Sequence, residues 1–183
     1  MKKIFLFFAL ILLINLQAQD KEPLKFSQVV KVSDSTKSSI ALHTAAKMWF
    51  AQNFKNPKEV IIMEDTDNKI LVGRGNLKYS SKVFMGSAAR EGWITFDVTI
   101  ACKDGRYKYD FTNFIHEGQS VNLGIITNEE MLSTLTGMFA GGPKSYKIKV
   151  TNEIRDIISG KINLSIDNLK ETMNKSIITK EDW

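Results

Sequence analysis

The chain has 183 residues, with 25 basic and 20 acidic side chains that leave a formal excess of five positive charges. Without the two lysines of a predicted signal peptide at 1–18 the excess is three, which is too small to indicate nucleic acid or anionic lipid as a partner. Cys102 is the single cysteine, which excludes an intrachain disulfide.

Residues 1–18 have the pattern of a signal peptide. Lys2 and Lys3 form a charged start, residues 4–14 form an apolar core, and Leu-Gln-Ala at 16–18 is a small-residue cleavage site. The apolar run is shorter than the about 20 residues of a membrane-spanning helix, although a retained anchor is the alternative. We therefore predict an exported protein, periplasmic or secreted, that begins at Gln19 and has no stable membrane insertion after cleavage. Cleavage removes two lysines and lowers the excess to three positive charges.

The mature chain opens with a predicted strand and helix. Residues 26–32 are typical of a strand, and the Ser-Asp-Ser cluster at 33–35 favours a turn or a helix N-cap. An apolar stripe at helical spacing follows, formed by Leu42, Ala45, Ala46, Trp49, Phe50 and Phe54. Asn56-Pro57 ends this helix, because the residue before a proline avoids the α region.

A first hairpin is predicted from residues 60–63 and 70–72, and residues 77–79 continue its second strand. Asp65 and Asp67 in its turn are typical of side chains that hydrogen-bond their own backbone, since two aspartates supply too few oxygens for calcium. Gly73 and Gly75 indicate a bulge or the close approach of another group. Residues 80–91 are expected to form a loop.

A second hairpin is predicted from Trp93–Lys103 and Arg106–Ile115. It turns at Asp104-Gly105, a dipeptide typical of type I′ turns. Residues at equal distance from this turn face one another, so the predicted pairs are Val98 with Phe111, Ile100 with Tyr109, Asp97 with Thr112, Thr99 with Asp110, and Ala101 with Lys108. Apolar side chains meet on one face and polar ones on the other, which predicts one buried and one wet face.

The last third of the chain is predicted to be helical. Thr127 and Glu130 form a capping box that opens a helix to about Ala140. Beyond a Gly-Gly-Pro sequence, apolar residues recur at three- and four-residue steps from Val150 to Ile177, as in a long amphipathic helix.

These elements predict an α+β fold with the element order β-α-β-β-β-β-α. Short connections allow the second to fifth strands to run as an antiparallel sheet, with the helices on its apolar face and a long C-terminal helix among them. We expect one domain, made of the sheet and first helix at 19–126 and a helical extension at 127–183.

The segment CKDGRYKY at 102–109 resembles the KDGRYRY signature of a bacterial family of unknown function with a TBP-like (TATA-box-binding-protein-like) fold. The stretches at 26–32, 45–50 and 70–75 also resemble this family, so the similarity covers about residues 24–115. The resemblance implies a TBP-like antiparallel sheet and an exported protein. It assigns no catalytic or binding residue, and the fold does not by itself imply nucleic-acid binding.

No catalytic residue, metal site or cofactor is predicted. His43 and His116, the two histidines, lack acidic or cysteine neighbours at metal-ligand spacing. Cys102 has neither a histidine nor a helix N-terminus beside it in sequence to lower its pKa. Asp97 and Asp110 share the polar hairpin face, where cross-strand charge balance is the usual role of carboxylates. A general acid–base pair is the alternative, and it requires a pocket.

Two hypotheses for the function follow. In the first, a non-enzymatic module binds a protein, peptide or glycan through the polar sheet face, with Trp93, Arg106 and Lys108 as contact residues. Trp93 is alternatively covered by the loop at 80–91. In the second hypothesis, loops 80–91 and 117–126 form the site of a small exported hydrolase-like enzyme, which would require a deep pocket with convergent polar groups. Nucleic acid is not expected as a partner, because three excess charges neutralise few phosphates.

Overall fold

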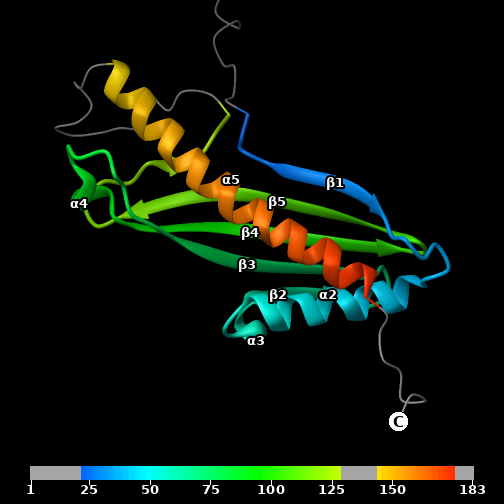
Figure 1. Cartoon of the computed structure of the whole chain (residues 1–183). Helices are drawn as coiled ribbons and strands as arrows, with labels where there is room; N and C mark the ends of the chain where they lie inside the picture. Colours follow the sequence, from blue (N-terminus) through cyan, green and yellow to red (C-terminus); the bar gives the residue numbers. More distant parts are fainter. Residues whose placement is uncertain (1–21, 129–143, 176–183) are drawn as a thin grey trace, which may run out of the picture.

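The computed structural model describes residues 22–128 and 144–175, which form a sheet with helices packed against it (Figure 1). The strands are β1 (Phe26–Lys31), β2 (Ile61–Asp65), β3 (Ile70–Tyr79), β4 (Gly92–Lys103), β5 (Arg106–Gly118) and β6 (Gly124–Ile125). The helices are α2 (Ser39–Asn53), α3 (Pro57–Val60), α4 (Ser87–Arg90) and α5 (Lys144–Asn174). None of the described helices combines the length and the apolar composition needed to cross a membrane.

The sheet has the strand order β1-β5-β4-β3-β2, with β6 beside β5, and all neighbouring strands are antiparallel. The antiparallel arrangement predicted for the second to fifth strands is confirmed. β1 pairs with β5 on the side that β4 leaves open, so the first strand of the fold lies next to its second hairpin.

The helices α2 and α5 bury one face of this sheet, and Figure 1 shows α5 running obliquely across the strands. Alternate side chains of β4 are buried on that face, namely Ile94, Phe96, Val98, Ile100 and Cys102. The intervening side chains of β4 lie on the opposite face, which no described helix covers and which we call the open face. The predicted buried and wet faces are therefore confirmed.

The core forms where α2 meets the second hairpin. Trp49 of α2 is fully buried, and its ring lies edge-on to the ring of Phe111 at a centroid distance of 6.3 Å. Phe111 pairs with Val98, as predicted, and neither side chain is exposed. The predicted close approach at Gly73 is also confirmed, because a Cβ atom there would lie 2.4 Å from a ring carbon of Phe50.

The hairpin register follows the prediction from the turn as far as the pair Asp97–Thr112, and then shifts by one residue. The cause is a bulge at Asn113, whose backbone has a φ angle of 57°. Asn accepts this left-handed conformation more readily than most residues do. Because of the extra residue, Phe114 and His116 turn to the buried face, whereas Ile115 lies on the open face.

Some predicted boundaries differ from the structure. β2 ends at Asp65 and β3 runs unbroken from Ile70 to Tyr79, both longer than predicted. The short helices α3 and α4 and the short strand β6 were not expected, and the predicted loop at 80–91 contains α4. The signal peptide, the helix expected to reach Ala140 and the apolar position Ile177 lie outside the described residues.

Candidate functional site

The three predicted contact residues lie on the open face, but not together. Trp93 keeps 53% of its surface exposed, so the loop at 80–91 does not cover it. It pairs with Glu117 at one end of the second hairpin, whereas Arg106 pairs with Lys103 at the other end. The ten residue steps from Trp93 to Lys103 along β4 span about 33 Å at the rise of a strand. Lys108 lies at the Arg106 end, next to Ala101.

Ion pairs occupy the middle of the open face. Asp97 accepts hydrogen bonds from Arg74 at 2.8 Å and from Asn113 at 2.8 Å, and the bond from Arg74 is the main cause of a lowered pKa at Asp97. Asp110 lies 2.9 Å from Lys108 and 3.2 Å from Lys25. Asp97 therefore balances charge across strands, as predicted, whereas Asp110 pairs with Lys108 of its own strand and with Lys25, which precedes β1.

A row of three cations crosses the open face near the hairpin turn. Lys103 of β4 is directly opposite Arg106 of β5, and Arg106 is directly opposite Lys31 of β1. All three residues are exposed. Within the described ranges, none of the three has a carboxylate at ion-pair distance. We call Lys31, Lys103 and Arg106 the basic row.

The nearest acidic residue in the sequence does not neutralise this row. Asp104, at the hairpin turn, accepts a hydrogen bond from the backbone N–H of Ser39 at 2.6 Å. This bond holds the carboxylate at the N-terminus of α2, where a negative charge is favourable, and lowers the pKa of Asp104. The carboxylate of Asp104 therefore stabilises the N-terminus of α2.

A hollow of about 520 Å³ lies beside the basic row. Three small or branched apolar residues from three strands line it, Val29, Ile70 and Ala101, and Val29 is 59% exposed. Lys103, Arg106 and Lys108 also line the hollow. An apolar floor with cations at its margin suits a ligand that carries negative charge along an extended backbone.

The sequence analysis missed Lys31, Lys103 and Val29. Lys103 could have been predicted, because the register of the hairpin already places it opposite Arg106. Lys31 and Val29 could not have been predicted, because β1 is far from β5 in sequence and no local signal places the two strands side by side.

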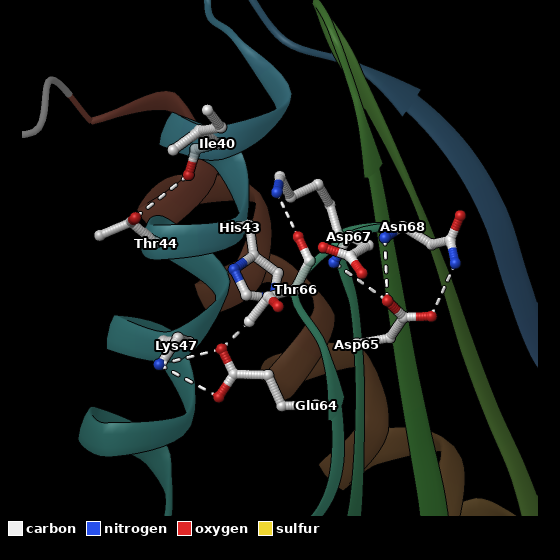
Figure 2. Close-up of polar contacts among 10 residues, drawn as sticks. Ile40, His43, Thr44, Lys47, Glu64, Asp65, Thr66, Asp67 and Asn68 are labelled. Carbon is white, nitrogen blue, oxygen red and sulfur yellow. Dashed lines mark hydrogen bonds and ion pairs between the residues drawn. The ribbon is translucent and has the colours of Figure 1, made fainter.

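The side chains of Cys102 and of the two histidines are buried and do not belong to the exposed surface of the open face. Cys102 is buried, and burial raises the pKa of its thiol to about 12, which opposes a nucleophilic role. His43 of α2 is also buried, and burial is the main cause of its lowered pKa (Figure 2). In residues 22–128 and 144–175, no three histidine, cysteine or acidic side chains are grouped as metal ligands.

Figure 2 shows the first hairpin turn and its neighbours on α2. Asp65 accepts hydrogen bonds from the backbone N–H groups of Asp67 at 3.1 Å and Asn68 at 2.9 Å. These bonds confirm that Asp65 supports its own turn. Glu64 lies on the α2 side of β2 and pairs with Lys47 at 3.0 Å, which ties the hairpin to the helix.

The loops at 80–91 and 117–126 do meet. Gln119 donates its backbone N–H to the carbonyl of Glu91 at 2.9 Å, and Ser120 donates to Ala89 at 3.0 Å. His116 lies fully buried beneath them, with Nδ1 accepting from the N–H of Leu123 at 3.1 Å. Its Nε2 therefore carries the hydrogen and donates to the carbonyl of Arg90 at 2.9 Å. Both ring nitrogens are used in holding the loops.

Two charged side chains, Arg90 and Glu153, hold the loop at 80–91 in place. The buried Arg90 donates to the carbonyls of Met85 at 2.8 Å and Val83 at 2.9 Å. Glu153 of α5 accepts from the hydroxyls of Ser81 and Tyr79 and from the backbone N–H groups of Lys82 and Val83. Burial opposes the charged carboxylate, but these bonds outweigh it and lower the pKa of Glu153.

Comparison with known proteins agrees with this architecture. A family model described as a domain of unknown function (DUF4468) with TBP-like fold matches residues 26–117, half of the chain. The chain belongs to this family. The predicted membership of a TBP-like family of unknown function is thus confirmed. A search of curated proteins found no match.

Two solved structures are similar to this DUF4468 chain. A DUF4468 family protein from Bacteroides ovatus ATCC 8483 is 12% identical, with a TM-score of 0.54 over 85% of this chain and 90% of that one. A TBP-like protein from Parabacteroides distasonis ATCC 8503 is 11% identical, with a TM-score of 0.50 over 81% of this chain and 93% of that one. Identities this low show the fold alone, and the predicted TBP-like α+β fold is confirmed.

Proposed function

We propose that this protein is an exported, non-enzymatic module that binds an extended anionic peptide or glycan, and not nucleic acid, through a site on the open face of its sheet. The observation that carries the proposal is the basic row. Like charges directly opposite one another destabilise a sheet, and here two such pairs share Arg106 with no carboxylate from the described residues beside them. A bound anionic ligand would supply the missing charge.

The shape of the site supports an extended ligand. The apolar residues of the hollow, Val29, Ile70 and Ala101, come from β1, β3 and β4, and its cations Arg106 and Lys108 come from β5, so the hollow extends over four neighbouring strands. Trp93, about 33 Å from Lys103 at the rise of a strand, offers an exposed aromatic surface on the same face. A ligand of six residues spans only about 20 Å, so it would occupy the cation end of the face without contacting Trp93.

A purely protective role is the alternative for the basic row. Charged side chains keep exposed β-surfaces soluble without binding anything. A protective role requires only exposed charge, which lysines anywhere on the surface would supply. A binding role requires cations at these three positions. The two roles therefore predict different results when the same number of charges is removed at the basic row or elsewhere.

The experiment compares two triple variants of the mature protein. Lys31→Gln, Lys103→Gln and Arg106→Gln together remove the basic row, and Lys58→Gln, Lys149→Gln and Lys161→Gln remove the same charge from other exposed positions. The probes are hexaglutamate and a hexameric oligogalacturonate, with a single-stranded DNA hexamer for comparison. Binding is measured by calorimetry at low ionic strength.

We expect the basic-row variant to bind hexaglutamate or the oligogalacturonate about threefold to a hundredfold more weakly than wild type, since each exposed ion pair contributes about 0.2–1 kcal/mol. The control variant should bind as wild type does. Equal losses in both variants would contradict the proposal, because binding would then depend on net charge alone. DNA bound as tightly as the other probes would contradict it too.

A further inference from the structure

We infer that the ligand at the basic row is an acidic peptide that joins the sheet as an added strand beside β1. This inference rests on the function proposed above and names the chemistry of the ligand. β1 forms the margin of the sheet, because β5 is its one neighbour among the described strands (Figure 1). An edge strand presents backbone N–H and C=O groups to which an extended peptide can pair.

A hydrogen bond at the end of β1 shows which backbone groups point outward. Val32, which follows β1, donates its N–H at 3.1 Å to the carbonyl of Gly105, which precedes β5. In an antiparallel ladder alternate residues bond to the same neighbour. The N–H and C=O groups of Ser27, Val29 and Lys31 therefore point away from β5. No backbone hydrogen bond from the described part of the chain reaches them on that side.

The same three residues carry side chains on the open face. Val29 is opposite Lys108, and Lys31 is opposite Arg106. A strand added beside β1 would place every second side chain on this face, next to Lys31 and with Arg106 one strand further in. Neighbouring strands are about 4.8 Å apart, so a glutamate on the added strand reaches both cations.

The lysines of β1 and its flank favour an acidic peptide at this edge. Lys25 and Lys31 lie at either end of β1, and no acidic residue lies between them. A second copy of this chain, paired edge to edge, would bring these lysines together and is disfavoured. An acidic strand meets the opposite charge along the same edge. A glycan lacks the alternating N–H and C=O groups that the edge would pair with.

The test uses a short peptide that alternates glutamate and threonine, together with two derivatives. One derivative is N-methylated at every glutamate and the other at every threonine. An added strand pairs with β1 through alternate residues only, so one derivative loses these hydrogen bonds and the other keeps them. We expect one derivative to bind at least about tenfold more weakly than the parent peptide, and the other within about threefold of it.

A variant of β1 gives a second, independent readout. Val29→Pro removes one outward N–H, and proline is tolerated on an edge strand where that group faces solvent. Val29→Ala is the matched control for the lost side chain. Val29→Pro should melt near wild type and bind the parent peptide more weakly than Val29→Ala does. If Val29→Pro fails to fold, the two methylated peptides still decide the question.

Each outcome separates this inference from the function that it rests on. Equal binding of the parent and both methylated peptides would overturn strand addition and leave an anionic ligand held by charge alone. Binding of oligogalacturonate without binding of the peptide would also overturn it. Failure of every anionic probe to bind would overturn the proposed function itself.

Discussion

At single positions, alternation along the strands separates side chains that support the fold from those that face solvent. Phe111 and Thr112 are neighbours on β5, yet Phe111 is fully buried and Thr112 lies on the open face. The sequence alone predicts this difference, because apolar and polar residues alternate on both sides of the Asp104-Gly105 turn. It does not predict the burial of Phe114 and His116, which depends on the bulge at Asn113.

Replacement of Phe111 by alanine should lower the free energy of unfolding by about 3–5 kcal/mol, as for other buried aromatic side chains. Thr112→Ala, its control on the open face, should change the free energy by no more than about 0.5 kcal/mol. Denaturant melts of the two variants measure both values. Similar losses at the two positions would mean that the assignment of faces is wrong.

The positive charge of Lys103 is expected to lower the stability of the fold and to strengthen ligand binding. Lys103→Glu replaces a like-charge pair with Arg106 by an attractive one, so the free energy of unfolding should rise by about 0.2–1 kcal/mol. The same change should weaken binding of hexaglutamate. Lys78→Glu is the control, because Lys78 already pairs with Glu91 at 3.5 Å and should not gain stability. A loss of stability in Lys103→Glu would remove the main argument for the basic row as a ligand site.

His116 is expected to make the free energy of unfolding depend on pH. Burial is the main cause of its pKa lying below the usual 6.5, and the same holds for His43. The unfolded chain then binds more protons than the folded chain as pH falls below 6.5. The free energy of unfolding should therefore be highest above this pH and should fall as the pH is lowered toward the folded pKa values.

Urea melts at about pH 7.5 and about pH 5 measure this change. His116→Leu should show a smaller decrease between the two pH values than wild type, whatever its absolute stability. A decrease of equal size in His116→Leu would assign the pH dependence to other groups.

At the scale of elements, the strands and long helices follow from local pattern, and the loop at 80–91 does not. Its sequence shows small residues around an apolar centre and predicts no fixed shape. The structure holds it through Arg90 and through Glu153, which is 72 residues away from Ser81 in the chain. The loop presents Phe84 with 94% of its surface exposed. Only the packing of α5 reveals this support.

Glu153→Ala should loosen the loop without unfolding the sheet. The carboxylate accepts the backbone N–H groups of Lys82 and Val83, and hydrogen bonds to charged groups contribute about 1.5–3 kcal/mol each. Hydrogen exchange at these two amides should accelerate by at least about tenfold. Glu171→Ala is the control, since Glu171 pairs with Lys175 on the same helix. Unchanged exchange in Glu153→Ala would mean that the loop is held by other contacts.

At the scale of the whole molecule, the sequence predicts the antiparallel sheet and the helix-covered face, whereas strand order needs the structure. β1 and β5 are joined by contacts between distant segments such as Lys31 and Arg106. Without that pairing, Arg106 and Lys108 are two cations on a hairpin. With it they adjoin Lys31, Lys103 and an apolar hollow.

Export is a prediction for the whole chain. The charged start and short apolar core of residues 1–18 predict cleavage after Ala18 in the native host. Mass spectrometry of the protein recovered from the envelope or the medium should find Gln19 as the first residue. An intact N-terminus at Met1 would reverse the assignment of the compartment.

The most direct test of the binding account is a map of where an anionic chain touches the protein. Backbone amide NMR spectra of the mature protein are recorded during titration with hexaglutamate. Binding at the basic row should give saturable shifts at Val29, Lys31, Lys103 and Arg106, with little change on the helices α2 and α5. Shifts spread over all exposed lysines, or confined to the loops at 80–91 and 117–126, would contradict it.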